Sequence, residues 1–200
     1  VSKALDLWFK GRRYKGKDSV AKKKAFYRAG LGALGDLKPL ADTVWPKNPE
    51  GVELIFHETI ALPDFPDIRC RIAEFTVEKI IQYGILLEPK ADGNYPLVVY
   101  MHGAAYGVPA FAIDTYARLA RAGYAVAVPA MRGEPLFAGS KFSKLKLPVK
   151  YHSTGHIENL IGEVSDGIGM AVGAMAQPKI KAGKYAVVGH SFGSGAGILM

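Results

Sequence analysis

The order of apolar and polar positions divides the chain into three stretches that predict different structure. Up to residue 50, apolar positions recur near helical spacing over Ser19–Leu34, and three prolines then mark a connecting segment. From Gly51 the apolar residues fall into short runs rich in strand-forming residues. From Leu97 onward, such runs alternate with longer helical segments. We therefore expect a basic helical appendage and linker over residues 1–50, and an α/β domain over residues 51–200.

Three strands are predicted close together after Gly51. In Ile68–Phe75, apolar and charged residues alternate with the period of a strand. The segments on either side are rich in β-branched and other strand-forming residues, and they cover Val52–Leu62 and Lys79–Leu87. Because the connections between the three segments are short, we expect an antiparallel group at one edge of a sheet.

The next stretch predicts a βαβαβ arrangement. Leu97–Met101 is almost continuously apolar, as in strands that are covered on both faces. Helices are predicted at Ile113–Ala122 and Glu158–Ala176, and strands at Tyr124–Pro129 and Tyr185–Val188. With the earlier strands, this order predicts an α/β fold: a mainly parallel sheet with antiparallel N-terminal strands and with helices on both faces.

Charge is concentrated at the start of the chain. The formal net charge is +8, and residues 1–28 hold ten basic and two acidic residues, which accounts for all of it. Such a segment can bind nucleic acid or anionic lipid, but we favour a solvated appendage and expect no nucleic-acid partner. No apolar run approaches the roughly 18–20 residues of a membrane span, so no transmembrane segment is expected. Cys70 is the only cysteine, which excludes an internal disulfide and leaves the cellular compartment open.

The strongest chemical signal is the Gly-x-Ser-x-Gly sequence at residues 189–193, directly after an apolar strand. A turn of this kind between a strand and a helix exposes the serine hydroxyl at the end of a sheet. Gly189 and Gly193 remove side chains that would collide with the neighbouring strand and helix. Ser191 is therefore the predicted nucleophile. The alternative is a glycine-rich turn that only packs a helix on a sheet.

A second segment, Tyr100–Gly107, predicts hydrogen-bond donors for the reaction. Backbone N–H groups in a turn rich in glycine after a strand can point at the oxyanion of an acyl-transfer reaction. We expect the amides of Ala104 and Phe192 to be these donors. The Ala105 amide and the Tyr106 hydroxyl are weaker candidates.

The histidines are predicted to have supporting roles. His102 and Gly103 are expected to support the oxyanion loop, with His102 as an orienting residue and not as the general base. His152, His156 and Glu158 have a loose metal-like spacing, but no further ligand set is visible in the sequence. We expect structural or surface roles for these three residues and no metal site.

These residues together resemble the α/β-hydrolase fold, and within it the branch of acetyl-xylan esterases, dienelactone-hydrolase-like enzymes and prolyl-oligopeptidase-type peptidases. The resemblance covers roughly residues 51–200. It implies a Ser–His–acid triad in which the acid and the histidine follow the serine. Both would come after Met200, so we expect the domain to be incomplete at the C-terminus and the chain alone to be inactive. Four segments carry the resemblance: Tyr83–Lys90, Tyr95–Gly103, Arg132-Gly133 and Val187–Gly193.

The predicted function is a serine hydrolase that cleaves carboxylic esters of small molecules through an acyl-enzyme on Ser191, without a metal or an organic cofactor. A prolyl-oligopeptidase-type serine peptidase is the alternative enzyme, and a non-catalytic binding protein on the same fold is the alternative of another class. Upstream residues such as His152, Glu163 and Asp166 would contradict the order of the triad. The Gly-x-Gly-x-x-Gly pattern of Gly30–Gly35 follows a helical stretch and not a strand, so no nucleotide cofactor is expected.

Overall fold

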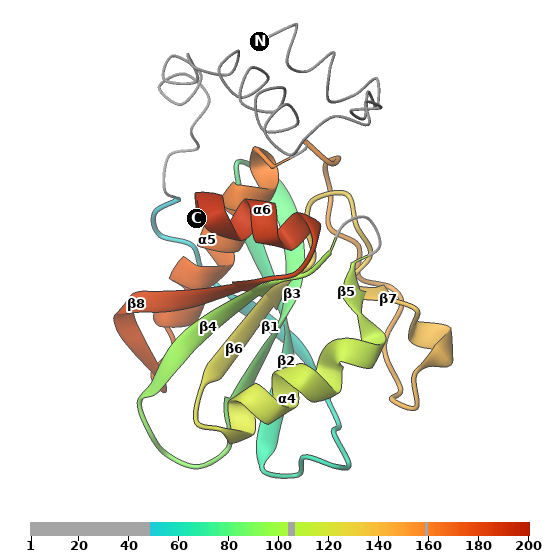
Figure 1. Cartoon of the computed structure of the whole chain (residues 1–200), viewed down its shortest axis with the longest axis vertical. Coiled ribbons are helices and arrows are strands. Elements are labelled where there is room, and N and C mark those ends of the chain that lie inside the picture. The colour runs from blue at the N-terminus through green and yellow to red at the C-terminus, as the bar shows by residue number, and fades with distance from the viewer. Residues whose placement is uncertain (1–48, 104–106, 159) are drawn as a thin grey trace, which may run out of the picture. The chain divides into compact units, whose positions relative to one another are not determined.

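The computed structural model describes residues 49–103, 107–158 and 160–200 (Figure 1). The predicted basic segment of residues 1–28, the helix at Ser19–Leu34 and the Gly30–Gly35 pattern lie outside the described residues. No helix in the part of the chain that the structure describes is long and apolar enough to cross a membrane.

The described residues form a six-stranded mixed sheet with the strand order β1-β2-β3-β6-β4-β8 (Figure 1). Strands β1, β2, β3 and β6 pair antiparallel in turn, whereas β6, β4 and β8 run parallel to one another. This confirms antiparallel N-terminal strands that lead into a parallel part. The strands are β1 (Ile55–Ile60), β2 (Ile68–Val77), β3 (Ile80–Pro89), β4 (Tyr95–Met101), β6 (Ala125–Pro129) and β8 (Ile180–Gly189).

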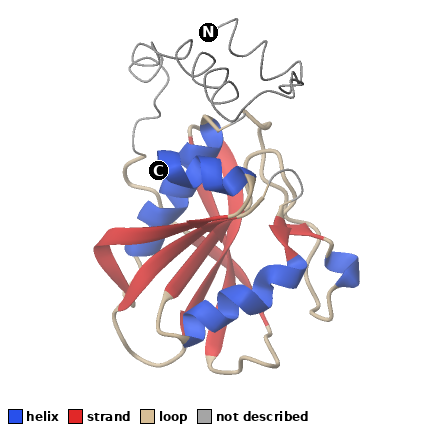
Figure 2. Ribbon diagram, viewed as in Figure 1, coloured by secondary structure: helices blue, strands red, loops and turns tan. Residues whose placement is uncertain are grey.

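Helices cover both faces of the sheet, as predicted (Figure 2). Helix α4 (Ile113–Arg121) packs on one face, and α5 (Gly162–Met175) and α6 (Phe192–Leu199) pack on the other. A small parallel pair, β5 (Val108–Pro109) with β7 (Phe137–Ala138), and two short 3-10 turns, at Ala110–Ala112 and Ser140–Phe142, were not predicted. These elements span two or three residues each, which is too short to give a periodic pattern.

Alternation of side chains along a strand lets strand β6 contribute residues to two hydrophobic cores. In β6, Val126 and Val128 belong to the core beneath α4, whereas Ala125 and Ala127 belong to the core beneath α5 and α6. Successive side chains of a strand point to opposite faces, so a strand between two helical layers has to be apolar throughout. The continuously apolar runs in this half of the chain therefore mark central strands.

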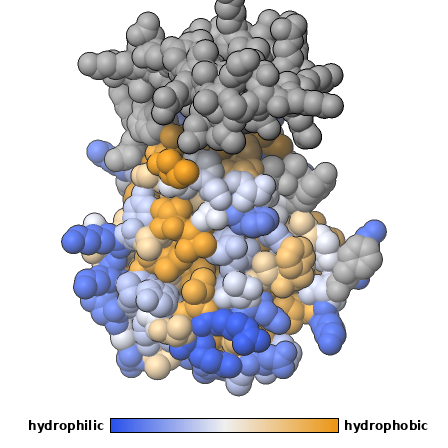
Figure 3. Space-filling view, in the orientation of Figure 1, coloured by the Kyte–Doolittle hydropathy of each residue, from blue (hydrophilic) through white to orange (hydrophobic). Residues whose placement is uncertain are grey.

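Strand β8 lies at the edge of the described sheet, where it pairs with β4. Among its residues, Val188 is partly exposed, and Ile198 of the following helix α6 is largely exposed. Figure 3 shows apolar surface over this part of the molecule.

The prediction that the second long helix begins at Glu158 was wrong, since α5 begins at Gly162. Leu160 has a φ of 81°, which a right-handed helix excludes. The Glu163 carboxylate instead accepts the N–H groups of Glu158 and Leu160 at 2.7 and 2.9 Å. A side chain at the start of the helix therefore holds the preceding residues in a turn.

A buried arginine joins the turn after β6 to α5. The guanidinium of Arg132 is almost inaccessible to solvent, and its Nη2 lies 2.8 Å from Oδ1 of Asp166, which is fully buried. The backbone N–H of Arg132 also donates to Asp166, at 2.9 Å. Glu78 and Glu158 bind the same guanidinium from the solvent side. The Arg-Gly turn that the sequence singled out is therefore held in place by a buried charge network.

Candidate active site

Ser191 occupies the sharp turn between β8 and α6, with a φ of 53° and a ψ of −120°. A positive φ is rare for a residue with a side chain and costs about 1–3 kcal/mol, so surrounding contacts must hold it. The N–H of His190 donates to the Met101 carbonyl at 3.0 Å, and the N–H of Ser194 donates to the Ser191 carbonyl at 2.9 Å. These bonds fasten the turn to the end of β4 and to the first turn of α6, and the serine itself is exposed.

The two glycines of the motif are required by close approach of the backbone. A Cβ at Gly193 would lie 2.1 Å from the carbonyl oxygen of Met101 and 2.4 Å from that of His102. A Cβ at Gly189 would lie 2.5 Å from the Cα of Ser194. No side chain fits at either position, because the colliding atoms belong to the backbone.

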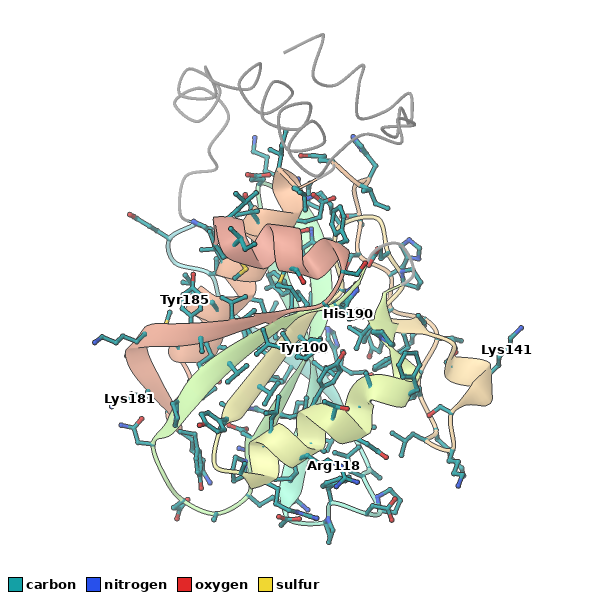
Figure 4. All side chains as sticks on the ribbon, viewed as in Figure 1. Tyr100, Arg118, Lys141, Lys181, Tyr185 and His190 are labelled. Carbon is teal, nitrogen blue, oxygen red and sulfur yellow. The ribbon has the colours of Figure 1, made fainter. Side chains whose placement is uncertain are left out.

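The chain directly after β4 lies beside the serine. A Cβ at Gly103 would lie 3.3 Å from the Cβ of Ser191 and 3.0 Å from Nδ1 of His190. His190 is exposed and lies where β8 ends (Figure 4). Segments far apart in the sequence, around Gly103 and around Ser191, thus meet at the carboxyl ends of two neighbouring parallel strands.

The structure describes only one of the two predicted oxyanion donors, Phe192. Phe192 is the first residue of α6, a position at which a helix N–H has no acceptor within the helix. Ala104, with the weaker candidates Ala105 and Tyr106, lies outside the described residues, so its role stays a prediction.

His102 is buried and contacts the loop that it was predicted to support. Its Nδ1 donates to the carbonyl of Gly103 at 2.8 Å, and its Nε2 lies 3.5 Å from Oε2 of Glu134. Glu134 is also buried, and its carboxylate accepts the N–H of Gly107 at 3.0 Å. Sequence reasoning missed Glu134, for which the only signal was an acidic residue directly after the Arg-Gly pair.

Three of the residues considered upstream of the serine have structural contacts: His152, Glu158 and Asp166. Nε2 of His152 donates to the Gly133 carbonyl at 3.2 Å, and Glu158 binds Arg132. Asp166 belongs to the buried arginine network, where burial raises its pKa to about 6 although Arg132 opposes the shift. Within the described residues, no three His, Cys, Asp or Glu side chains lie close enough together to hold a metal ion.

A groove of about 720 Å³ lies along residues 49–55 and 74–78. Four glutamates line it, but two of them have partners: Glu74 binds His57, and Glu78 binds Arg132. No residue of the serine turn lines this groove, so it adds nothing to the candidate active site.

The chain is similar to known proteins in its structure but not in its sequence. No protein-family model and no curated protein sequence matches the chain. A solved structure of a Bacteroides fragilis protein assigned to the acetyl xylan esterases aligns with a TM-score of 0.56 and 13% identity, over 99% of this chain and 55% of its own. Acetyl xylan esterase 1 from a Thermoanaerobacterium species aligns with a TM-score of 0.49 and 19% identity, over 74% of this chain and 47% of its own. Esterase Est22 aligns with a TM-score of 0.44 and 16% identity, over 90% of this chain and 50% of its own.

The chain thus spans about half the length of these solved structures. The alignment with the Bacteroides fragilis protein covers nearly all of the chain. It agrees with a mixed sheet that has helices on both faces. The chain therefore has the fold of the α/β-hydrolases.

Proposed function

We propose that this chain carries the nucleophile of a serine hydrolase that cleaves carboxylic esters through an acyl-enzyme on Ser191. The observation that carries the proposal is the conformation of Ser191, with its positive φ, at the turn between β8 and α6. A fold that holds a strained serine at the exposed end of its sheet presents the hydroxyl to an incoming carbonyl group.

The proposed reaction has two steps. The Oγ of Ser191 attacks the ester carbonyl, a base takes the hydroxyl proton, and the alcohol leaves with a proton returned by that base. Water then attacks the acyl-enzyme and releases the acid. The Phe192 amide, at the start of α6, is proposed to bind the oxyanion together with an amide of the segment after Gly103.

The base and its acid are proposed to lie after Met200. The resemblance implies this order, and the upstream candidates His152 and Asp166 are engaged in the contacts described above. The chain alone is therefore proposed to have little turnover, and the function belongs to the full-length protein.

Acetyl esters of carbohydrates are the first substrates to test, because two of the structurally similar proteins are acetyl xylan esterases by name. A small acyl group also suits a site in which Gly103 runs directly beside the serine.

Labelling with a fluorophosphonate tests the proposal. Full-length protein should react at Ser191, and Ser191→Ala should abolish the reaction. The matched control is Ser194→Ala, which removes a hydroxyl one helical turn away and should label like the wild type. Absence of an adduct on Ser191 would favour a non-catalytic binding protein, and hydrolysis of peptides without hydrolysis of esters would favour the peptidase.

A further inference from the structure

Two strongly exposed apolar side chains lie near the small β5–β7 pair. Phe111 is 87% exposed and Val149 is 77% exposed, and among the described residues only Ile198 of α6 is comparable. A single exposed apolar side chain is ordinary, but apolar side chains that lie close together within a polar rim mark an interaction site. The proposed hydrolysis uses neither Phe111 nor Val149.

The backbone brings these two residues to the same end of the β5–β7 pair. The two strands run parallel, so the 3-10 turns that follow them, Ala110–Ala112 and Ser140–Phe142, lie side by side (Figure 1). The chain that returns to Tyr151 runs antiparallel to the start of β7, and the N–H of Leu136 donates to the Tyr151 carbonyl at 2.9 Å. Val149, two residues before Tyr151, therefore lies toward the end of the pair from which the 3-10 turns leave.

Lysines accompany the two apolar side chains. Residues 139–150 contain four lysines and no acid. Leu145 and Leu147 are partly buried against the core beneath α4. The residues that alternate with them, Lys144 and Lys146, are exposed. The leucines therefore anchor this segment to the domain while the two lysines face solvent.

The local charge is positive. Lys141 extends from its 3-10 turn away from the sheet (Figure 4). Lys150 pairs with Glu58 at 2.6 Å, and Asp114 lies in the first turn of α4, which follows Phe111. These two acids stand against four lysines, so the region attracts an anionic partner.

We infer that Phe111, Val149 and the lysines of residues 139–150 form a docking surface for an anionic lipid bilayer. At such an interface, ammonium groups bind lipid phosphates while apolar side chains enter the boundary between headgroups and acyl chains. Nucleic acid would also attract the lysines, but it offers no apolar layer that takes up Val149. A second copy of this chain would bring the same lysines, whose like charges repel. The inference is independent of the proposed ester hydrolysis.

Sedimentation of the full-length protein with lipid vesicles tests the inference. Vesicles of phosphatidylcholine with about 30% phosphatidylserine should bind the wild type, and phosphatidylcholine alone should bind it about tenfold more weakly or less. Lys144→Gln combined with Lys146→Gln should weaken binding to the anionic vesicles by about 25-fold, because each basic residue near such a surface contributes about fivefold. Phe111→Ser should weaken it by about tenfold, since the inserted ring is lost.

Ile198→Ser is the matched apolar control, because Ile198 is 84% exposed on α6. Lys181→Gln combined with Lys184→Gln is the matched charge control, because both lysines are exposed on β8, and Lys181 lies across the domain from Lys141 (Figure 4). Both controls should bind the anionic vesicles within about twofold of the wild type, since the attraction falls off with distance from the bilayer.

Unchanged binding in Phe111→Ser or in the Lys144 and Lys146 double variant would overturn the inference, because another part of the chain would then hold the lipid. Absence of wild-type binding, or equal binding to both kinds of vesicle, would overturn it as well. Circular dichroism checks that each variant folds, and if one does not, the other decides. Binding of duplex DNA without binding of vesicles would favour a nucleic-acid partner, and self-association that Phe111→Ser abolishes, again without vesicle binding, would favour a second copy of the chain.

Discussion

Replacing Arg132 with methionine should destabilise the fold in a way that depends on pH. Arg132→Met keeps the length of the apolar stem but removes the guanidinium, which donates to Asp166, Glu158 and the Gly162 carbonyl. Asp166 would then remain fully buried without its cation. Removing one partner of a buried ion pair costs about 3–5 kcal/mol of unfolding free energy, because the other charge stays in the interior.

The sign of the pH dependence follows from Asp166. In the wild type, burial already raises its pKa to about 6, and Arg132 acts in the opposite direction. Without Arg132, the folded-state pKa should rise further above the unfolded value of about 3.9. A raised pKa means that the folded state binds the proton more tightly than the unfolded state does. Protonation of Asp166 therefore stabilises the folded variant most at low pH. That stabilisation is lost as the pH rises through the folded-state pKa.

Denaturant unfolding at pH 5 and at pH 8, followed by circular dichroism, measures the effect. At pH 8 the loss should be about 3–5 kcal/mol, or roughly 6–20 °C in the melting temperature of a domain of this size. At pH 5, where Asp166 can take up a proton, the loss should be smaller by at least about 1 kcal/mol. Arg118→Met is the matched control, because Arg118 lies exposed on α4 (Figure 4), and it should change stability by less than about 0.5 kcal/mol. Equal losses at both pH values would refute the reasoning.

Three further outcomes are expected. Burial raises the pKa of the Cys70 thiol to about 12, so very little of the reactive thiolate is present at pH 8. A thiol reagent should therefore label Cys70 only at the rate of unfolding, and fast labelling of the native protein would contradict its burial. Gly193→Ala should destabilise the fold by about 1–3 kcal/mol and abolish fluorophosphonate labelling, because the added Cβ collides with the Met101 carbonyl. Gly195→Ala is the control and should label normally, because its Cβ meets only the Leu160 side chain. Glu163→Ala should lower the free energy of unfolding, measured by thermal unfolding, by about 1–3 kcal/mol, since it leaves two backbone N–H groups without their acceptor. A change below about 0.5 kcal/mol would show that the residues before α5 do not need the carboxylate.

The sequence predicted the elements that depend on local pattern. The alternation in β2 and the apolar run of β4 identified strands, and the Gly-x-Ser-x-Gly turn after β8 identified the position of Ser191. These features are readable because burial of a strand or helix face imposes its period on the residues of that segment.

Other features depend on contacts between distant segments, which no local pattern records. Helix α5 begins late because the Glu163 carboxylate holds the preceding turn, and the position of Leu160 gives no hint of its positive φ. Glu134 contacts His102 and Gly107 across about thirty residues of chain, so these contacts became visible only in the folded structure.

The central claim is that Ser191 is the nucleophile, and trapping the acyl-enzyme tests it most directly. Full-length protein is mixed briefly with p-nitrophenyl acetate, quenched in acid, digested and mapped by mass spectrometry. The account predicts one acetyl group on the peptide that contains Ser191, and no acetylation of that peptide in Ser191→Ala, which should also lose ester hydrolysis. Ester hydrolysis that survives Ser191→Ala at the wild-type rate, or an acetyl group that accumulates on a different residue, would contradict it.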